Sequence, residues 1–247
     1  MSSLKFTLEN IDKVIDRSAM VAPEIDPKRT ALLVMDMQPV CTDANGALAI
    51  PSVGGAPSGK DTVEPVERVV KRFREEGCPV IWSQWGLSPD GLDKGICALK
   101  WPGLNPGTPD SPASWGNPQT DNFAGELEPL EGEPVLRRSR FSVFFGTQLE
   151  EYLRELGTEF LVIAGITSAN CVHSTTIDAW NRIYKVIVLA DCTTAVPSPH
   201  THDVPLGYGQ HWEALRNIQM NYGDVITSEE LFGKLDAAKK SDKYQRA

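Results

Sequence analysis

A cysteine stands where a buried strand is predicted to end and a helix to begin. The apolar run EFLVIAG (159–165) is typical of a strand, and Val172, Ala179 and Ile183 follow near helical spacing. Cys171 lies between the two patterns, where the unpaired N–H groups and the dipole of a helix start favour a thiolate. The position therefore indicates a nucleophile, although an inert buried cysteine at a strand–helix junction also fits this spacing.

Two charged residues lie at or along other apolar runs. Asp36 closes the run TALLVMDM (30–37), and Arg138 lies in the weaker run PVLRRSRF (134–141). In parallel sheets, ligands bind outside the carboxyl ends of the strands, so residues at these ends are candidates for a shared site with Cys171. An arginine near the thiol is expected to lower the pKa of the cysteine further.

The elements that must position these residues follow from the hydrophobic pattern. Four β-branched runs predict strands that are covered on both faces, and two weaker runs predict a fifth and a sixth strand. The four runs span 30–37, 79–85, 159–167 and 185–193, and the weaker ones span 134–141 and 224–228. Helical patterns at 63–77 and 147–157 each stop at a glycine. This alternation predicts an α/β fold with a parallel sheet and right-handed crossovers.

The stretch from residue 86 to residue 133 differs from the rest of the chain. It contains GLSPDG and WPGLNPGTPDSPASWGNP but few periodic apolar residues. A connection of this length is typical of a lid over a site, which would bring Trp101 or Trp115 to the substrate; packing in a surface loop explains these residues nearly as well. No internal repeat is present, so residues 1–247 are expected to form one domain with this lid-like insertion at about 86–133.

Composition narrows the class of protein. A formal net charge of −9 over 247 residues argues against a nucleic-acid or anionic-membrane partner. No run approaches the ~18 apolar residues of a membrane-spanning helix, and the start MSSLKFTLENIDKVIDR is too charged for a signal peptide. The 5 cysteines form no CxxC pair, which predicts reduced thiols and a cytoplasmic location.

Three blocks of the sequence together resemble the isochorismatase-like cysteine hydrolase superfamily, which includes N-carbamoylsarcosine amidase, biuret and ureidoacrylate hydrolases, and nicotinamidases. The blocks are TALLVMDMQ, RRSRFSVFFGTQLEEYLRELG and LVIAGITSANCVHSTTIDAWNRIYKVIVLADCTTA. The resemblance implies a Rossmann-like three-layer α/β/α fold with a six-stranded parallel sheet, usually in a homo-oligomer such as a dimer or tetramer. It also implies an Asp–Lys–Cys triad that hydrolyses C–N bonds of amides and ureas without a cofactor.

The resemblance places the aspartate at Asp36 and the nucleophile at Cys171. It also implies a non-proline cis peptide at Ile166–Thr167, which would aim the N–H of Thr167 alongside that of Cys171 as an oxyanion hole. Arg138 stands where the family has lysine, and an arginine keeps the positive charge but cannot shuttle a proton. We expect Arg138 to act as a fixed charge; the alternative is a bidentate grip on Asp36 or on a substrate carboxylate.

The predicted function is cysteine-dependent cleavage of a C–N bond in a small amide, carbamoyl or urea-type substrate. The alternative is a non-catalytic or binding member, in which the arginine at position 138 has ended the chemistry. Trp85, Phe144 and Phe145 are expected to line the substrate pocket, with core packing as an equally good explanation. The vinyl-ether hydrolysis of isochorismatase itself is disfavoured, because members with that activity lack the cysteine that this chain keeps. Which amide or urea is the substrate does not follow from these motifs.

No metal is expected in the site. In the superfamily that this chain resembles, nicotinamidases carry an Asp-x-His metal site after the second strand. At that place this chain reads SQWGLSPDG, without histidine. His200 and His202 are spaced as a possible ligand pair, but two imidazoles in a loop are usually only solvated. His173 is expected to be a polar residue on a helix rather than a general base.

Overall fold

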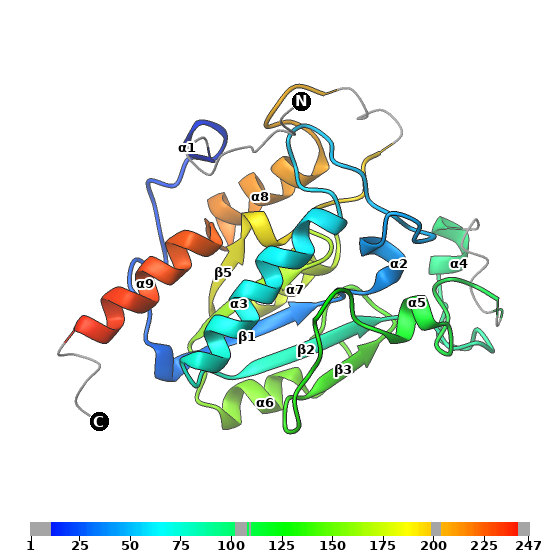
Figure 1. Cartoon of the computed structure of the whole chain (residues 1–247), viewed down its shortest axis with the longest axis horizontal. Coiled ribbons are helices and arrows are strands. Elements are labelled where there is room, and N and C mark those ends of the chain that lie inside the picture. Colours follow the sequence, from blue (N-terminus) through cyan, green and yellow to red (C-terminus); the bar gives the residue numbers. More distant parts are fainter. Residues whose placement is uncertain (1–10, 102–107, 109, 199–203, 242–247) are drawn as a thin grey trace.

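The structure is a computed structural model and describes residues 11–101, 108, 110–198 and 204–241. Its centre is a parallel sheet of six strands in the order β3-β2-β1-β4-β5-β6 (Figure 1). The strands are β1 (Thr30–Met35), β2 (Val80–Trp85), β3 (Val135–Arg138), β4 (Phe160–Gly165), β5 (Lys185–Leu189) and β6 (Gly223–Ile226). The prediction of a six-stranded parallel sheet is confirmed, and the weak run at 134–141 contains an edge strand.

Helices connect the strands on both sides of the sheet. The described helices are α1 (Ile11–Val14), α2 (Pro39–Thr42), α3 (Val63–Glu75), α4 (Cys97–Lys100), α5 (Pro118–Asp121), α6 (Leu149–Glu155), α7 (Cys171–Asn181), α8 (Gln210–Asn221) and α9 (Ser228–Lys240). Short 3-10 helices span Pro27–Arg29, Lys60–Thr62 and Ala190–Cys192. As predicted, α3 and α6 end just before Gly77 and Gly157.

The two faces of the sheet carry two separate apolar cores. Leu32 and Val34 of β1 face α3 and α9, whereas Ala31, Leu33 and Met35 face α6, α7 and α8 (Figure 1). Because both faces are covered, every residue of β1 is buried and the strand has no polar face. This arrangement confirms the three-layer α/β/α fold.

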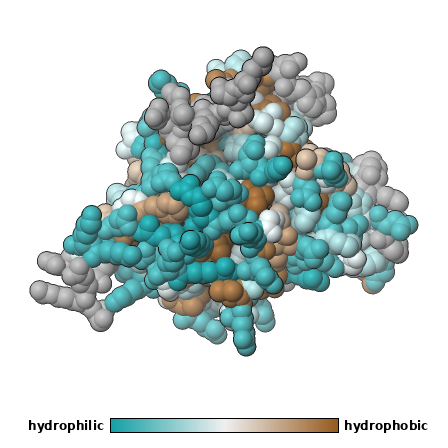
Figure 2. Space-filling model, viewed as in Figure 1, coloured by the Kyte–Doolittle hydropathy of each residue, from teal (hydrophilic) through white to brown (hydrophobic). Residues whose placement is uncertain are grey.

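The outer surface over α3 and α9 is mostly hydrophilic (Figure 2). Val66, Val69, Val70 and Phe73 of α3 are all buried, so its charged side chains are left on the outward face. Among the described residues, no helix combines the length and the apolar character needed to cross a membrane.

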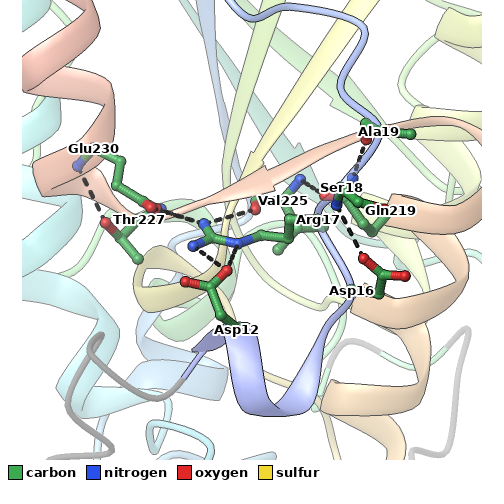
Figure 3. A network of polar contacts seen from close by, with 9 residues as sticks. All are labelled: Asp12, Asp16, Arg17, Ser18, Ala19, Gln219, Val225, Thr227 and Glu230. Atoms are coloured by element: carbon green, nitrogen blue, oxygen red, sulfur yellow. Dashed lines mark hydrogen bonds and ion pairs between the residues drawn. The ribbon is translucent and has the colours of Figure 1, made fainter.

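The described part of the N-terminal segment is held to β6 and α9 by Arg17 (Figure 3). Its guanidinium lies 2.7 Å from carboxylate oxygens of both Asp12 and Glu230, and it donates to the Val225 carbonyl at 3.4 Å. Glu230 also forms the capping box of α9 with Thr227. One polar cluster therefore ties the start of the described chain to its last strand and its last helix.

Several strands end before their apolar runs do, and β4 and β5 show this at the sheet edge. β4 ends at Gly165 rather than 167, and β5 ends at Leu189 rather than 193. Residues beyond these ends stay buried but turn out of the sheet, so their apolar character reflects packing above the sheet edge rather than strand pairing. The turn after β4 leads into α7.

Candidate active site

The site lies at the carboxyl ends of β1 and β4, the two central strands. Met35 pairs with Gly165, so Asp36 and Ile166 begin two neighbouring loops. The strand order reverses between β1 and β4, which opens a crevice because the chain leaves the two strands toward opposite sides. The loop after β4 leads directly to Cys171, the first residue of α7.

The two loops approach each other closely at Gly165. A Cβ atom on this residue would lie 2.0 Å from the Met35 carbonyl oxygen, and the φ of Gly165 is +116°. Only glycine accommodates both the contact and this backbone conformation. The glycine that precedes the cysteine loop is therefore required for β1 and β4 to lie side by side at this level.

Arg138 reaches the site from the edge strand β3. Side chains alternate along this strand, so Arg138 is buried while Arg137 points outward and lies over the Trp115 ring at 4.9 Å. β2 lies between β3 and β1, so the Arg138 side chain must span two strand spacings, or about 10 Å, to reach Asp36. Only a long side chain can do so.

The carboxylate of Asp36 is held at both oxygens. Nη2 of Arg138 lies 2.5 Å from Oδ2, and the Ser83 hydroxyl donates to Oδ1 at 2.9 Å. Nη1 of Arg138 donates to the Arg140 carbonyl at 2.6 Å. The Arg138 side chain is only 1% exposed, so its guanidinium faces Asp36 and the protein interior rather than solvent.

The direction of the pKa shift at Cys171 differs from the expectation. Burial raises the pKa of the thiol above its ordinary value and the nearby Asp36 adds to this, whereas Arg138 lowers it. The expectation that the helix start and Arg138 would depress this pKa is wrong, because desolvation of a cysteine that is 8% exposed outweighs the cation. At rest the thiol is protonated.

Arg138 keeps its charge in this buried position. Burial alone disfavours the guanidinium, but Asp36 and Cys171 outweigh it and raise the pKa of Arg138. The site therefore contains a permanent cation, a carboxylate and a thiol within interaction distance of one another.

The loop from Ile166 to Cys171 has the backbone arrangement that the resemblance implied. The Ile166–Thr167 peptide is cis. The Thr167 carbonyl accepts hydrogen bonds from the N–H groups of Asn170 and Val172, both at 3.1 Å, and Ser168 N–H donates to the Thr194 carbonyl. Among the described residues, none accepts a hydrogen bond from the N–H of Thr167 or Cys171, so both donors are available at the crevice.

A cavity of about 290 Å³ opens above these groups. Its lining contains Asp36, Thr167 and Cys171, and Trp85 as expected. The remaining lining residues are Gln38, Val40, Cys41, Leu48, Ala49, Trp101, Phe141, Ile166, Asn170 and Val196. The volume is that of a small-molecule site.

Phe144 and Phe145 are not among the described residues that line this cavity. Phe144 is buried in the core beside α6 and α7, where it stacks on Tyr184, and Phe145 is 65% exposed. The structure therefore does not place these two residues in the cavity, in contrast to Trp85. Phe141, three residues earlier than Phe144, supplies the aromatic wall instead, because the chain turns away from the sheet edge after β3.

The long segment after β2 contributes one tryptophan to the cavity. Trp101 lines the wall and contacts Phe141 at a ring-centroid distance of 5.4 Å. Trp115 instead packs over Gly86 and Arg137. Leu87 pairs with Ser114, which folds the segment back onto the end of β2.

Gln38 is a site residue that the sequence analysis missed. Its Oε1 accepts from the Trp85 N–H at 2.9 Å, and its Nε2 donates to the carbonyls of Trp85 and Thr120. The buried amide thus extends the pairing of β1 and β2 beyond the strand ends and fixes the Trp85 backbone. Its position two residues after Asp36, at the same sheet edge, was the available signal.

Cys41 is a second thiol in the same cavity. Burial, followed by the nearby Asp36, raises the pKa of Cys41 to about 12. Unlike Cys171, it has no arginine to oppose this shift. Cys41 therefore serves as an internal control for the reactivity of Cys171.

The histidines lie away from the reacting groups or outside the described residues. His173 forms a hydrogen bond with the Asn217 side chain at 2.9 Å and so faces α8. His200 and His202, the possible ligand pair, lie outside the residues that the structure describes. Within the described part of the chain, no group of three or more His, Cys, Asp or Glu residues is arranged to hold a metal ion.

Known proteins are similar to this chain in sequence and in fold. The chain is similar to the ureidoacrylate amidohydrolase RutB of Methylorubrum extorquens, with 31% identity over 233 residues, covering 90% of this chain and 87% of that protein. Its structure is similar to that of a cysteine hydrolase from Pseudomonas syringae pv. phaseolicola, with a TM-score of 0.78, 25% identity and coverage of 90% and 99% of the two chains. It is also similar to N-carbamoylsarcosine amidase from Thermoplasma acidophilum, with a TM-score of 0.60, 26% identity and coverage of 81% and 97%.

The family match covers the whole sheet and the site. Residues 30–230 match the family described as the Isochorismatase domain, which begins here at the first residue of β1 and extends past β6. Asp36, Arg138 and Cys171 all fall inside this range. The chain therefore belongs to the isochorismatase family.

Proposed function

We propose that this protein is a cysteine-dependent amidohydrolase that cleaves a C–N bond of a small amide, carbamoyl or urea-type substrate through a covalent intermediate on Cys171. At the coarser level, the chain is a hydrolase of carbon–nitrogen bonds other than peptide bonds. The observation that carries the finer proposal is the cluster of Asp36, Arg138 and Cys171 at the reversal point of the sheet, in which Asp36 and Cys171 line the cavity and Arg138 is buried against Asp36.

The first step transfers the thiol proton. Because the pKa of Cys171 is raised by burial, the thiolate forms as its proton passes to Asp36 and the sulfur attacks the carbonyl carbon. Arg138 stabilises the negative charge on this pair of groups and does not itself exchange a proton. The N–H groups of Thr167 and Cys171 then donate to the developing oxyanion.

The second step breaks the C–N bond. Asp36 returns its proton to the leaving nitrogen, which departs as ammonia or an amine and leaves an acyl or carbamoyl thioester on Cys171. Water then attacks the thioester carbonyl and gives a proton to Asp36. The C–S bond breaks, and the thiol recovers its proton from Asp36.

Ammonia release across a panel of small amides, carbamoyl compounds and ureas tests this proposal. The Cys171→Ser protein should lose turnover, whereas Cys41→Ser should retain it, although both cysteines line the cavity. Asp36→Asn should lower kcat by about 10²–10⁴-fold, because the carboxylate takes up and returns the proton. Intact-mass measurement after a rapid quench should show an adduct that is lost in the Cys171→Ser protein.

If the protein is instead a non-catalytic member of the family, the opposite result is expected. Such a protein would release no ammonia from any compound of the panel and would carry no adduct on Cys171. Near-normal turnover in Asp36→Asn would instead keep the activity but remove Asp36 from the mechanism.

A further inference from the structure

The walls of the active-site cavity are predominantly apolar. The polar lining residues are Asp36, Gln38, Thr167 and Asn170, together with the thiols of Cys41 and Cys171. The surrounding apolar side chains are Val40, Leu48, Ala49, Trp85, Trp101, Phe141, Ile166 and Val196. Trp101 and Phe141 are in mutual contact, so one wall is a continuous aromatic surface. A substrate that places its carbonyl at the thiol must lay the rest of the molecule against these walls.

None of the nearby cations is among the described residues that line the catalytic cavity. Both terminal nitrogens of Arg138 are engaged, one by Asp36 and one by the Arg140 carbonyl, and its side chain is 1% exposed. Lys94, Lys100 and Arg140 line a neighbouring cavity of about 420 Å³, which shares Trp85, Trp101 and Phe141 with the catalytic cavity but whose cations are not among the described residues that line the catalytic one. Among the described residues that line the catalytic cavity, Asp36 is the only charged one.

We infer that the substrate carries an uncharged, apolar group next to its scissile C–N bond. This inference rests on the proposed function and specifies its substrate class. An apolar group would exchange water for contact with the aromatic and aliphatic walls. A carboxylate in the same place would lose its hydration without gaining a cation and would lie near Asp36. Ureidoacrylate, named in the relatives, bears a carboxylate, so this chain is expected to differ from them in preference.

Matched substrates that differ only in charge test the inference. The first pair consists of two amides: 4-methylpentanamide ends in an isopropyl group, and succinamate ends in a carboxylate of similar shape. The second pair consists of two ureas that differ in the same way: N-(3-methylbutyl)urea ends in isopropyl, and 3-ureidopropionate ends in a carboxylate. In at least one pair the uncharged member should have a kcat/KM at least about 100-fold higher, corresponding to loss of the buried, unpaired charge. A higher kcat/KM for the anionic member of each pair overturns the inference and leaves the proposed amidohydrolase intact.

Binding to an inactive protein separates the inference from the proposed function. The Cys171→Ser protein should bind the uncharged members more tightly than the anionic ones in calorimetric titrations. If it does so while the wild-type protein hydrolyses neither, the proposed chemistry fails and the preference stands. Equal or tighter binding of the anionic members contradicts the preference whatever the turnover.

A cation placed on the cavity wall should reverse the preference. Leu48 is half-buried in the lining and Val196 is partly exposed there, so Leu48→Lys and Val196→Lys each bring a charge to the wall without opening the core. At least one of them should raise the ratio of anionic to uncharged kcat/KM by about tenfold or more. Leu130→Lys, an identical change at an exposed residue between α5 and β3, should leave the ratio unchanged. An unaltered ratio in both cavity variants counts against the inference.

Discussion

Arg138 is the residue at which this chain departs from the expected triad, and its surroundings indicate what it contributes. The guanidinium is buried against Asp36 and is held from the other side by the Arg140 carbonyl. Arg138 is not among the described residues that line the catalytic cavity, which argues against direct binding of a substrate carboxylate by its guanidinium. The geometry favours a fixed positive charge, which balances Asp36 and opposes the rise in the pKa of Cys171 that burial causes.

Substitutions at Arg138 should separate charge from shape. Arg138→Lys keeps a cation beside Asp36 and should retain a substantial fraction of turnover. Arg138→Met leaves a buried carboxylate without its cation, so it should lower the free energy of unfolding by about 3–5 kcal/mol. It should also raise the pKa of Cys171 further and shift the pH profile of thiol alkylation upward. Urea denaturation and alkylation rates against pH measure the two effects.

Arg137→Met is the matched control for these changes. Arg137 lies on the same strand but points outward, over the Trp115 ring. This variant should keep the turnover and the alkylation profile of the wild-type protein. If Arg138→Met matched it in both respects, Arg138 would have no part in the site.

The long segment between β2 and β3 acts as an anchored wall of the site. Gln38 binds the Thr120 carbonyl, and the Leu87 N–H donates to the Ala113 carbonyl at 2.8 Å, so the segment is tied to the ends of β1 and β2. Among the described residues of this segment, Trp101 is the one that lines the cavity. The two tryptophans of this segment therefore have different roles.

Alanine substitutions should distinguish these two roles. Trp101→Ala removes one wall of the cavity and should raise KM by roughly 3- to 10-fold with little effect on thermal stability, since Trp101 is 37% exposed. Trp115→Ala removes the packing over Gly86 and Arg137 and should instead lower the free energy of unfolding by about 0.5–3 kcal/mol. Steady-state kinetics and urea denaturation of both proteins give the comparison. An unchanged KM in Trp101→Ala would exclude this residue from substrate binding.

At the scale of the whole molecule, a buried histidine makes the stability of the folded protein depend on pH. His211, at the start of α8, forms a hydrogen bond through Nδ1 with the Ser168 hydroxyl at 3.1 Å, and Ser168 belongs to the loop that precedes Cys171. No described residue forms a hydrogen bond with its Nε2. Burial lowers the pKa of His211 from 6.5 to about 3, so the folded protein keeps this imidazole neutral.

Acid stability should therefore depend on His211. As the pH falls below about 6.5, the unfolded chain binds a proton that the folded chain cannot take up until the pH is about 3, so the free energy of unfolding falls with pH across this window. The slope from one such group is at most about 1.4 kcal/mol per pH unit. In urea denaturation between pH 5 and 6.5, His211→Gln should show a shallower slope than the wild-type protein.

His173→Gln is the control for this measurement. His173 is half-buried and paired with Asn217, so this variant measures the effect of the same replacement at a histidine outside the loop that precedes Cys171. Equal slopes in His211→Gln and the wild-type protein would mean that His211 takes up its proton in the folded state.

The sequence by itself predicted the six strands, the helices α3, α6 and α7, and Asp36 and Cys171 as candidate site residues. Strands buried on both faces are continuous apolar runs, and helices with one buried face repeat apolar residues every three or four positions, so both leave a local signature. Asp36 was found because it directly follows such a strand, and Cys171 because it lies between a strand pattern and a helical pattern. The family blocks then predicted the assignment of Arg138 and the cis peptide at Ile166–Thr167, where the structure has it.

Only the tertiary structure decided what surrounds the thiol. The strand order β3-β2-β1-β4-β5-β6 sets which loops meet, and it brings residues as distant as Gln38, Trp101, Phe141 and Val196 to one cavity. The raised pKa of Cys171 likewise depends on burial by several separate segments, which no local pattern encodes. Phe144 and Phe145 lie outside the cavity lining for the same reason: the sequence shows that a residue is aromatic and near the site, but its direction depends on contacts with residues far along the chain.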